Sequence, residues 1–383
     1  MKKSIYLILI ISLFFYCGQK QDKQDKVERH REDGVEVVIN HIEPYKINGE
    51  PSTLILEEEF TIDTEKDEIA ASGLVEIYNF DVDSKGNVYC LRLKSKENHI
   101  FKFDKDGNFV AAFGRRGQGP GELIYPDMFI NDLDKLIIRN LMQSKILILN
   151  TNGNLIREIP LSLDLSVLKQ LENENYFTYT LSRSGPQDVQ LVWSIYSPEF
   201  EKIKDVERQE LHGDSGKFSY EIHKHYATGK NIYIGKRSPS YEIWVYDIEG
   251  NLKRKIKKDY EPVKLSDEYK KERIKRSEEM KKKGLPPPPG YSYVPEYWPA
   301  FHELFACDTG RLFVMTYEKS QNPREFVYDI FNPDGVFVGK VSLDNYRGMY
   351  SPFPVKIKNE RLYCLREKES GYKELVVCKM RWE

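Results

Sequence analysis

The feature that most constrains the fold of this chain is a turn motif that returns along the sequence. Each copy places an Asp or Asn, two further residues and a Gly between two segments of alternating apolar residues. Four copies share this form: "IFKFDKDGNFVAAF" (100–113), "ILILNTNGNLIREI" (146–159), "IWVYDIEGNLKRKI" (243–256) and "VYDIFNPDGVFVGKV" (327–341). A fifth copy, "WSIYSPEFEKIKDV" (193–206), lacks the glycine. We assign the turn positions to Gly107, Gly153, Glu199, Gly250 and Gly335, at intervals of 46, 46, 51 and 85 residues.

A second hairpin half precedes most copies, so each repeat holds four short strands. A period near 46 residues with four strands per unit predicts an all-β fold, a six-bladed β-propeller of four-stranded antiparallel blades. Aromatic residues make up 13% of the chain, which also favours strands over helices. The expected blades are 74–114, 122–160, 166–207, 218–258, 298–342 and 353–382. The last blade is one strand short, and we expect the N-terminal segment 53–63 to complete it and close the ring.

The first residues have the layout of an export signal. Lys2 and Lys3 precede a 13-residue apolar run, which is short for a membrane-spanning helix, and Cys17 ends that run. This resembles a lipoprotein-type signal peptide (1–17) in which Cys17 is lipidated, so we expect an envelope protein, facing the outer membrane or periplasm and anchored to the membrane by its lipid. The alternatives are an ordinary signal peptide or an uncleaved anchor. Residues 18–50 read as a polar tether, followed by the propeller at 51–383.

A glycine-rich stretch, "FGRRGQGPGE" (113–122), raises the question of a phosphate-binding loop. Such a loop requires a helix directly after the glycines, whereas a strand-like segment with Pro126 follows in this chain. We therefore predict a tight crossing between two blades. With its downstream repeat, the stretch resembles the NHL repeat. It resembles more closely the six-bladed propeller lipoproteins of Gram-negative bacteria, which carry a G-x-G-x-G-P-G-E loop.

Basic residues recur near the end of the second strand of each predicted blade. They are Arg92, Arg139, Arg183, Arg237, Lys319 and Arg366, and the first crossover adds Arg115 and Arg116. In a four-stranded meander these positions all lie on the face formed by the 2→3 hairpins and the 4→1 crossovers. We hypothesise a positive funnel for an anionic or carbohydrate ligand. The alternative is a set of ordinary solvated strand ends. The net charge of −2 argues against wholesale nucleic-acid binding.

An insertion at 259–297 separates the fourth and fifth blades. Ser266 as N-cap, acidic residues after it and lysines at 281–283 predict a solvated helix from 266 to 283. The aromatic residues that follow the helix return towards the ring: Tyr291, Tyr293, Tyr297 and Trp298. They suit sugar stacking or a protein partner, and equally the packing of the insertion onto blade five.

Catalytic motifs with a specific spacing are missing from the sequence. His223 and His225 share one face of an expected inner strand and are candidate zinc ligands, without evident third and fourth ligands. The resemblance to NHL-like enzymes implies acids and histidines on inner strands, and the comparable residues are Asp81, Asn131, Glu221, His223, His302 and Glu303. Apart from a divalent metal at this histidine pair, we expect no cofactor. Cys364 and Cys378 are symmetric about Gly371 and are candidates for a disulfide, whereas Cys307 has no evident partner.

These features favour a monomeric, lipid-anchored propeller that acts as a binding or interaction module. An anionic or carbohydrate ligand, or an envelope protein, would be its partner. Two alternatives stay open. One is an NHL-like metal-dependent lyase or hydrolase with its site in the central channel, and the other is a scaffold protein of an envelope complex.

Overall fold

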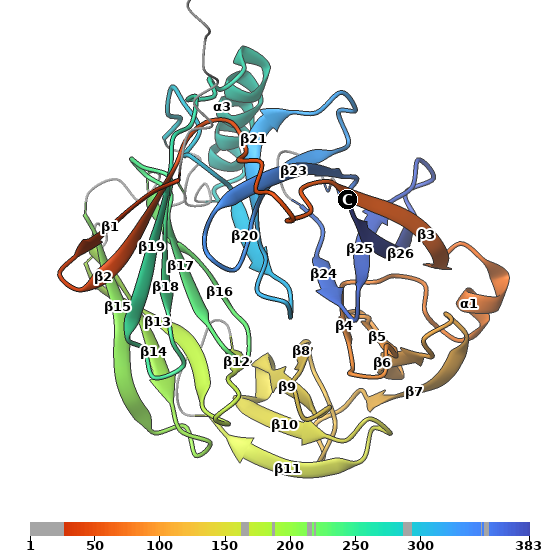
Figure 1. Cartoon of the computed structure of the whole chain (residues 1–383). Helices are drawn as coiled ribbons and strands as arrows, with labels where there is room; N and C mark the ends of the chain where they lie inside the picture. The colour runs from red at the N-terminus through yellow and green to blue at the C-terminus, as the bar shows by residue number, and fades with distance from the viewer. Residues whose placement is uncertain are drawn as a thin grey trace, which may run out of the picture.

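The alternating apolar segments form six antiparallel four-stranded units arranged around one centre (Figure 1). The computed structural model describes residues 27–161, 168–185, 188–212, 217, 220–285, 293–345, 347 and 352–383. The predicted signal peptide with Cys17, and Tyr291 of the insertion, lie outside the described residues. The predicted six-bladed β-propeller is confirmed.

The blades follow one another in chain order, and each runs from an inner strand near the centre to an outer strand at the rim. Blades one and two contain β4 (Asn79–Val82), β5 (Val88–Leu91), β6 (Asn98–Phe103), β7 (Phe109–Arg115), and β8 (Pro126–Ile130), β9 (Leu136–Asn140), β10 (Lys145–Leu149), β11 (Leu155–Pro160). Blades three and four contain β12 (Leu168–Gln170), β13 (Tyr176–Gly185), β14 (Asp188–Tyr196), β15 (Lys202–His212), and β16 (Lys224–Ala227), β17 (Ile232–Lys236), β18 (Glu242–Tyr246), β19 (Leu252–Lys258). Blades five and six contain β20 (Glu303–Ala306), β21 (Leu312–Lys319), β22 (Phe326–Phe331), β23 (Phe337–Leu343), and β24 (Val355–Lys358), β25 (Arg361–Glu367), β26 (Lys373–Trp382), β3 (Leu54–Asp63).

Blade six contains both an N-terminal and a C-terminal strand. Its outer strand β3 pairs antiparallel with β26 over its whole length, from Asp63 opposite Glu374 to Leu54 opposite Trp382. The prediction that segment 53–63 completes the ring is therefore confirmed. Pairing both chain ends in one blade leaves no unpaired edge at the point where the ring closes.

Each pair of adjacent blades encloses its own apolar core. One fully buried residue represents each core, in order from the interface of blades six and one: Leu375, Leu136, Ile146, Phe177, Phe331 and Ile330. Strand residues alternate between the two faces of a blade, so each blade contributes to two cores. The six cores together form the wall around the centre of the ring.

The turns between the third and fourth strands follow the repeat motif, with one correction. Gly107, Gly153, Gly250 and Gly335 all have positive φ, between 74° and 86°. In blade three the equivalent residue is Phe200, with φ of 64°, and not Glu199 as the sequence had indicated. The Phe200 amide donates to the Ser197 carbonyl, as the Gly107 amide donates to that of Asp104. The one-residue error arose because a glycine-free turn gives no marker for the left-handed position.

The predicted polar tether is wrong in its C-terminal part. Within residues 18–50, β1 (Glu28–Glu32) and β2 (Val35–Asn40) form a hairpin, and β2 pairs in parallel with β19 of blade four. Blade four is thus a six-stranded sheet. The outermost strand reads "ERHRE" and looks like a solvated linker, but charged residues are also what an exposed edge strand carries. Apolar residues of β2 such as Val38 are fully buried.

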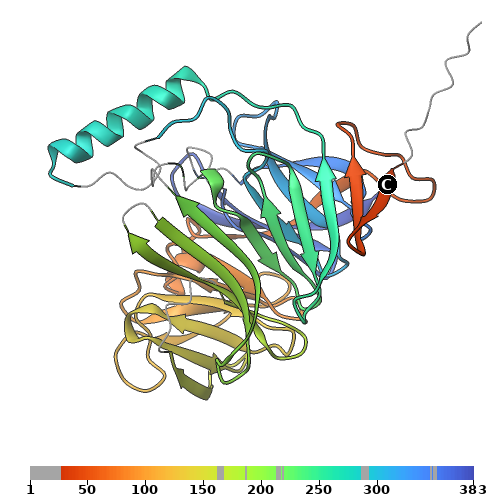
Figure 2. The ribbon, with the colours of Figure 1, turned by 90° about the vertical axis from the view of Figure 1, so that its left-hand side faces the viewer.

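The insertion contains the predicted helix, α3 (Asp267–Lys282), between β19 and β20. The hydroxyl of Ser266 accepts a hydrogen bond of 3.2 Å from the amide of Tyr269 and caps the helix as expected. Figure 2 shows α3 standing off the ring, in agreement with its largely solvated sequence. Two further short elements are α1 (Asp67–Ala71) and the 3-10 turn η1 (Leu141–Gln143). In the part of the chain that the structure describes, no helix is both long and apolar enough to cross a membrane.

The glycine-rich stretch is a crossing between blades one and two, as predicted. The strand β8 follows it, beginning at Pro126. The Glu122 carboxylate folds back and accepts a 2.8 Å hydrogen bond from the Gly119 amide, and a Cβ on Gly117 would clash with that carboxylate. The buried Asn140 amide donates to the Glu122 carbonyl at 3.0 Å. Polar groups of this loop therefore serve the loop itself and its anchoring to blade two.

Candidate functional site

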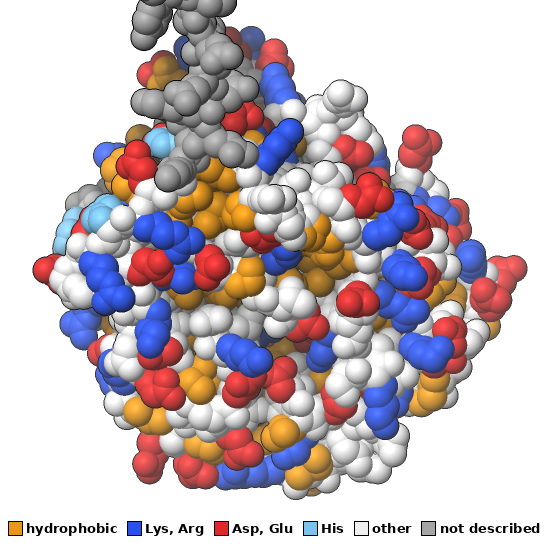
Figure 3. Space-filling model, viewed as in Figure 1, with side chains coloured by type: hydrophobic (Ala, Val, Ile, Leu, Met, Phe, Trp, Pro, Cys, Tyr) orange, Lys and Arg blue, Asp and Glu red, His pale blue; other side chains and the backbone are white. Residues whose placement is uncertain are grey.

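The basic residues of the predicted funnel lie apart around the ring, and most have protein partners. Arg92 donates to the Gly73 carbonyl at 2.7 Å, Arg116 donates to the Ser95 carbonyl at 3.1 Å, and Arg139 lies 3.5 Å from the Asp127 carboxylate. The side chains of Arg115, Arg183 and Lys319 are exposed. Figure 3 views the opposite face of the ring, on the side of the C-terminus, where acidic and basic side chains are interspersed. The geometry does not gather the predicted set into one site.

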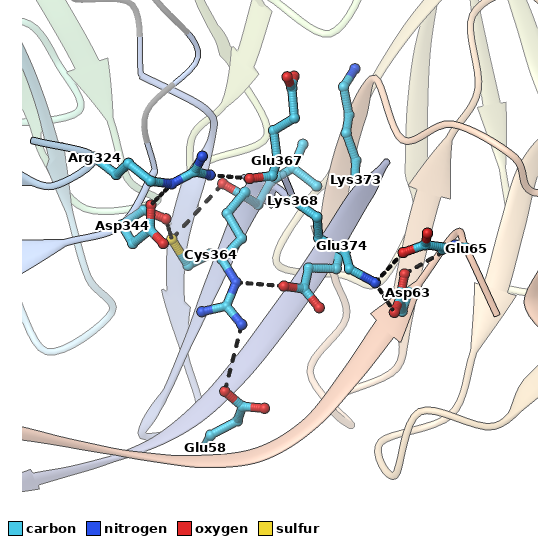
Figure 4. Close-up of polar contacts among 12 residues, drawn as sticks. Glu58, Asp63, Glu65, Arg324, Asp344, Cys364, Glu367, Lys368, Lys373 and Glu374 are labelled. Atoms are coloured by element: carbon cyan, nitrogen blue, oxygen red, sulfur yellow. Dashed lines mark hydrogen bonds and ion pairs between the residues drawn. The ribbon is translucent and has the colours of Figure 1, made fainter. Parts of the chain in front are cut away.

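Arg366 illustrates how these strand-end charges are used. Its Nε lies 2.7 Å from Glu374 on β26, and its Nη2 lies 3.9 Å from Glu58 on β3. In Figure 4, Glu58 and Glu374 point towards the same guanidinium from two neighbouring strands. Lys368 similarly contacts Asp63 of β3, at 2.9 Å. These contacts join β25 and the turn after it to β26 and β3, the two outer strands of blade six.

A second group of predicted residues does come together, beneath the insertion. Arg237, Tyr297 and Trp298 line one cavity of about 680 Å³. Arg237 is 3% exposed and donates to the Ile222 carbonyl at 3.2 Å. The Trp298 ring is 7% exposed and stacks on Tyr317 of blade five at 4.5 Å, so it packs the insertion onto the ring. Tyr297 is 46% exposed at the mouth of the cavity.

The two candidate zinc ligands lie in aromatic surroundings. His223 stacks on Trp193 at 5.7 Å, and His225 lies edge-on to Tyr179 at 4.9 Å. Burial, followed by nearby basic groups, lowers the pKa of His223 to about 4, and burial likewise lowers the pKa of His225 to about 4. Among the described residues, no three His, Cys, Asp or Glu side chains are grouped so that they would hold a metal ion. This environment fits packing of neutral imidazoles better than metal ligation.

The predicted disulfide is wrong because the hairpin register differs from the symmetric one. Gly371 closes a turn with Lys368, and the strands pair so that Cys364 faces Val376 and Cys378 faces Leu362. The two cysteines are therefore two residues out of register, and both are free thiols. Cys307 is also free, and its sulfur lies 2.9 Å from the Thr309 hydroxyl.

A cavity of about 460 Å³ occupies the central channel of the ring. The inner strands of all six blades contribute side chains to it, together with turns that follow those strands. The polar and charged residues that line it are Asp81, Asn131, Asp132, Lys169, Gln170, Glu172, Thr228, Lys230, Asn231, Asp308, Thr309, Lys356 and Lys358. The turns directly after the inner strands are 1→2 turns, so the cavity opens on the face opposite to the predicted funnel. Two candidates from the sequence, Asp81 and Asn131, do lie in this channel.

Asp81 is the buried acid of this channel. Its carboxylate lies 2.7 Å from the ammonium of Lys356 and accepts a 2.9 Å hydrogen bond from the Ile130 amide, which belongs to the inner edge of β8. Burial would raise the pKa of Asp81, but the positive charges of Lys356 and Lys169 outweigh burial and lower it. Asp81 is therefore an ionised carboxylate whose acceptors are largely used within the protein.

Lys169 is the second unusual group, and its ammonium differs from the others in the channel. It lies 5.2 Å from the centre of the Phe129 ring and 5.9 Å from that of the Tyr226 ring. Among the described residues it makes no hydrogen bond or ion pair. Burial and the nearby Lys356 lower the pKa of Lys169 to about 8. Lys358, by comparison, donates to the Val82 carbonyl at 3.1 Å. An anion in this cavity would therefore gain most binding energy from a hydrogen bond to the Lys169 ammonium, whose donors are not used by the described residues.

The remaining inner-strand candidates are used elsewhere. Glu303 forms a 2.6 Å ion pair with Lys224 of the neighbouring blade, and burial lowers the pKa of His302 to about 3. Glu221 lines the cavity beneath the insertion. Sequence reasoning missed Lys169, Lys356 and Lys358 because acids and histidines were sought on the inner strands. The available signal was a lysine inside short inner strands, as in "LKQ" and "VKIK".

A family model agrees with this architecture. The model DUF5128, described as a 6-bladed beta-propeller, matches residues 82–334. Among solved structures, a "Putative exported protein" from Bacteroides fragilis superposes with a TM-score of 0.51 at 15% identity, over 91% of this chain and 99% of that one. A DUF4221 family member from Bacteroides vulgatus gives 0.47 at 12% identity, over 87% of this chain and 100% of that one. A gluconolactonase from Xanthomonas campestris gives 0.41 at 9% identity, over 88% and 99%. No curated protein matches the sequence.

Proposed function

Because this chain belongs to the DUF5128 family of six-bladed β-propellers, we propose that it is an exported binding module whose central channel takes a small anionic ligand. The observation that carries the proposal is the Lys169 ammonium, which lines the channel cavity without a hydrogen-bond or ion-pair partner among the described residues. Lys356 and Lys358 add positive charge to the same cavity. Its volume lies within the range of about 300–1,000 Å³ that small-molecule sites occupy.

Export is supported by two observations. The first 17 residues have the layout of a lipoprotein-type signal, and the structural neighbour from Bacteroides fragilis is described as exported. We extend the proposal to a lipid on Cys17, which would tether the propeller to a membrane surface.

The chemistry of the channel favours a ligand with a carboxylate and hydroxyl groups. Lys169 and Lys356 supply the positive charge, while Asn131, Gln170 and Thr228 supply neutral donors and acceptors. Acidic residues occur where the turns reach the cavity, so a strongly charged polyanion would meet repulsion there; they are Asp132, Glu172 and Asp308. A monovalent acid of monosaccharide size, such as a uronate, meets these conditions best.

Isothermal titration calorimetry with glucuronate at neutral pH tests this proposal, with glucose as the uncharged comparison. We expect glucuronate to bind and glucose to bind at least tenfold more weakly, which corresponds to about 1.4 kcal/mol. Lys169→Met should abolish the preference, whereas Lys253→Met, which changes an exposed lysine outside the cavity, should preserve it. Equal affinity for the two sugars, or full glucuronate binding by Lys169→Met, would overturn the proposal.

The cavity beneath the insertion supports a second candidate function, recognition of a sugar or a peptide. Tyr260, Tyr293 and Tyr297 line this cavity beside Arg237, and aromatic faces with one basic group suit sugars and peptides. A Tyr297→Ala variant that loses a co-purifying protein would favour the scaffold alternative. The metal-dependent alternative draws no support from His223 and His225, given their aromatic packing.

A further inference from the structure

We propose that the channel ligand is an oxo acid, a carboxylate that also bears an aldehyde or ketone, and that Lys169 holds it as a reversible imine. This inference rests on the proposed anion-binding function of the channel and specifies the class of its ligand. The open-chain form of a uronic acid belongs to this class.

The position of Lys169 separates it from the other two channel lysines. Lys356 is held by the Asp81 carboxylate at 2.7 Å, and Lys358 by the Val82 carbonyl at 3.1 Å. Lys169 instead lies over the faces of Phe129 and Tyr226, on an inner strand that lines the cavity. An amine that lies against aromatic faces and beside a second cationic group is a recognised arrangement for a nucleophilic lysine.

The protonation state of Lys169 fits this role. Burial and the Lys356 charge both disfavour the ammonium form, and they lower the pKa of Lys169 to about 8. At neutral pH about a tenth of the side chains would then carry a free amine, compared with roughly one in two thousand for an exposed lysine. Lys356, in its ion pair with Asp81, lines the same cavity and is placed to attract the carboxylate of the ligand. One lysine thus reacts and another binds.

The chemical step balances without any further reactant. The Nζ lone pair attacks the carbonyl carbon, and a proton moves from nitrogen to the former carbonyl oxygen to give a carbinolamine. That hydroxyl then leaves together with the remaining N–H proton as water, the C=N bond forms, and addition of water reverses the step. No electron transfer occurs, so the ligand is captured and released unchanged.

Reductive trapping tests the inference directly. The full-length protein is incubated with glyoxylate and cyanoborohydride at pH 7, and the hydride converts any imine into a stable carboxymethyl amine. Peptide mass spectrometry then locates the modified lysines. We expect Lys169 to react on the order of 100-fold faster than the exposed Lys253, from the difference in free-amine fraction. Acetate should slow the reaction at Lys169 by competition, and propionaldehyde, which lacks a carboxylate, should react there more slowly than glyoxylate.

A matched variant separates this inference from the proposed function. In wild type, acetate, which has a carboxylate but no carbonyl, should bind in calorimetry without being trapped, whereas glyoxylate should be trapped at Lys169. Lys169→Arg, which cannot form an imine, should leave no position that is trapped faster than Lys253. If wild type binds acetate or glucuronate but glyoxylate shows no preference for Lys169, the imine is overturned and the anion site stands. If none of these acids binds to wild type, both are overturned. Circular dichroism and thermal melting confirm that the variant is folded.

Discussion

Asp81 on β4 and Lys356 on β24 form a 2.7 Å ion pair that connects the first blade of the ring to the last at the wall of the central channel. The Asp81 side chain is 9% exposed and that of Lys356 is 18% exposed. The pair therefore links ring closure to the charge balance of the proposed ligand site.

Asp81→Asn should destabilise the protein by about 3–5 kcal/mol, because it leaves two neighbouring positive groups, Lys356 and Lys169, without this counter-charge. Urea unfolding monitored by tryptophan fluorescence measures the change. The double variant Asp81→Asn with Lys356→Met should recover much of the loss. A single variant as stable as wild type would show that the pair contributes nothing to closure.

Stability should fall as the pH falls from about 6.5 towards 4. Burial lowers the pKa of His223 and the pKa of His225 to about 4, so in this window the unfolded chain binds protons that the folded protein does not. The stabilisation is fully present above a pH of about 6.5 and is lost progressively below it. His225→Phe should reduce the slope of unfolding free energy against pH by about 1.4 kcal/mol per unit, which corresponds to one proton. An unchanged slope would contradict a neutral, buried His225.

Gly153→Ala should cost more stability than Gly371→Ala, although φ is 82° at the first glycine and 83° at the second. Each substitution forces alanine into the left-handed region, at about 1–2 kcal/mol. A Cβ at position 153 would also approach the Phe113 ring to 2.4 Å, whereas position 371 has no atom within 4 Å. Overpacking adds about 1–3 kcal/mol at position 153. Equal thermal shifts in the two variants would show that contact with the neighbouring blade is irrelevant to the turn.

Asn40→Ala should destabilise the contact of the N-terminal hairpin with blades four and five by about 1–3 kcal/mol. The fully buried Asn40 amide donates to the Gly335 carbonyl at 3.0 Å and accepts from the Phe337 amide at 2.8 Å, and alanine satisfies neither. Hydrogen exchange should show faster exchange in β2 and at the Phe337 amide. His41→Ala, at the neighbouring and partly exposed position, is the control. Unaltered exchange in β2 would show that the hairpin is held by its strand pairing alone.

Cys17→Ser should release the protein from the membrane fraction of a Gram-negative host, because a serine cannot accept the thioether-linked lipid. Fractionation and labelling with radioactive palmitate measure this. Labelling that persists in the variant would exclude Cys17 as the acceptor. Absence of palmitate labelling in the wild-type protein would indicate an ordinary signal peptide or an uncleaved anchor instead.

The fold was predictable from sequence because its turns carry a local signature. Asp104 and Gly107 fix a turn through nearby contacts, and the same contacts recur in later blades, so the repeat shows the architecture without knowledge of the long-range packing. Where the turn has no glycine, as in blade three, the left-handed position was assigned to Glu199 and not to Phe200. The hairpin β1–β2 was missed because its partner, β19, lies more than 200 residues away in the sequence.

The candidate site was less predictable than the fold. The alternating strand direction of a meander identifies which loops share a face. Whether a side chain on that face is free to bind a ligand depends on the protein groups around it. Arg366 is bound by Glu374, eight residues away, and Arg92 by the backbone of Gly73. Lys169 stands out because its ammonium lies over the rings of Phe129 and Tyr226 and close to the charge of Lys356, and that is a property of several blades together.

The pairing of β3 with β26 also fixes the order in which the protein is completed. Residues 54–63 are synthesised among the first of the described chain, yet their partner strand is synthesised last. Blades one to five hold their four strands within consecutive segments and are free to form as the chain lengthens, whereas β3 and the hairpin before it must wait. A chain exported from its N-terminus would therefore cross the membrane with its closing strand first and unpaired.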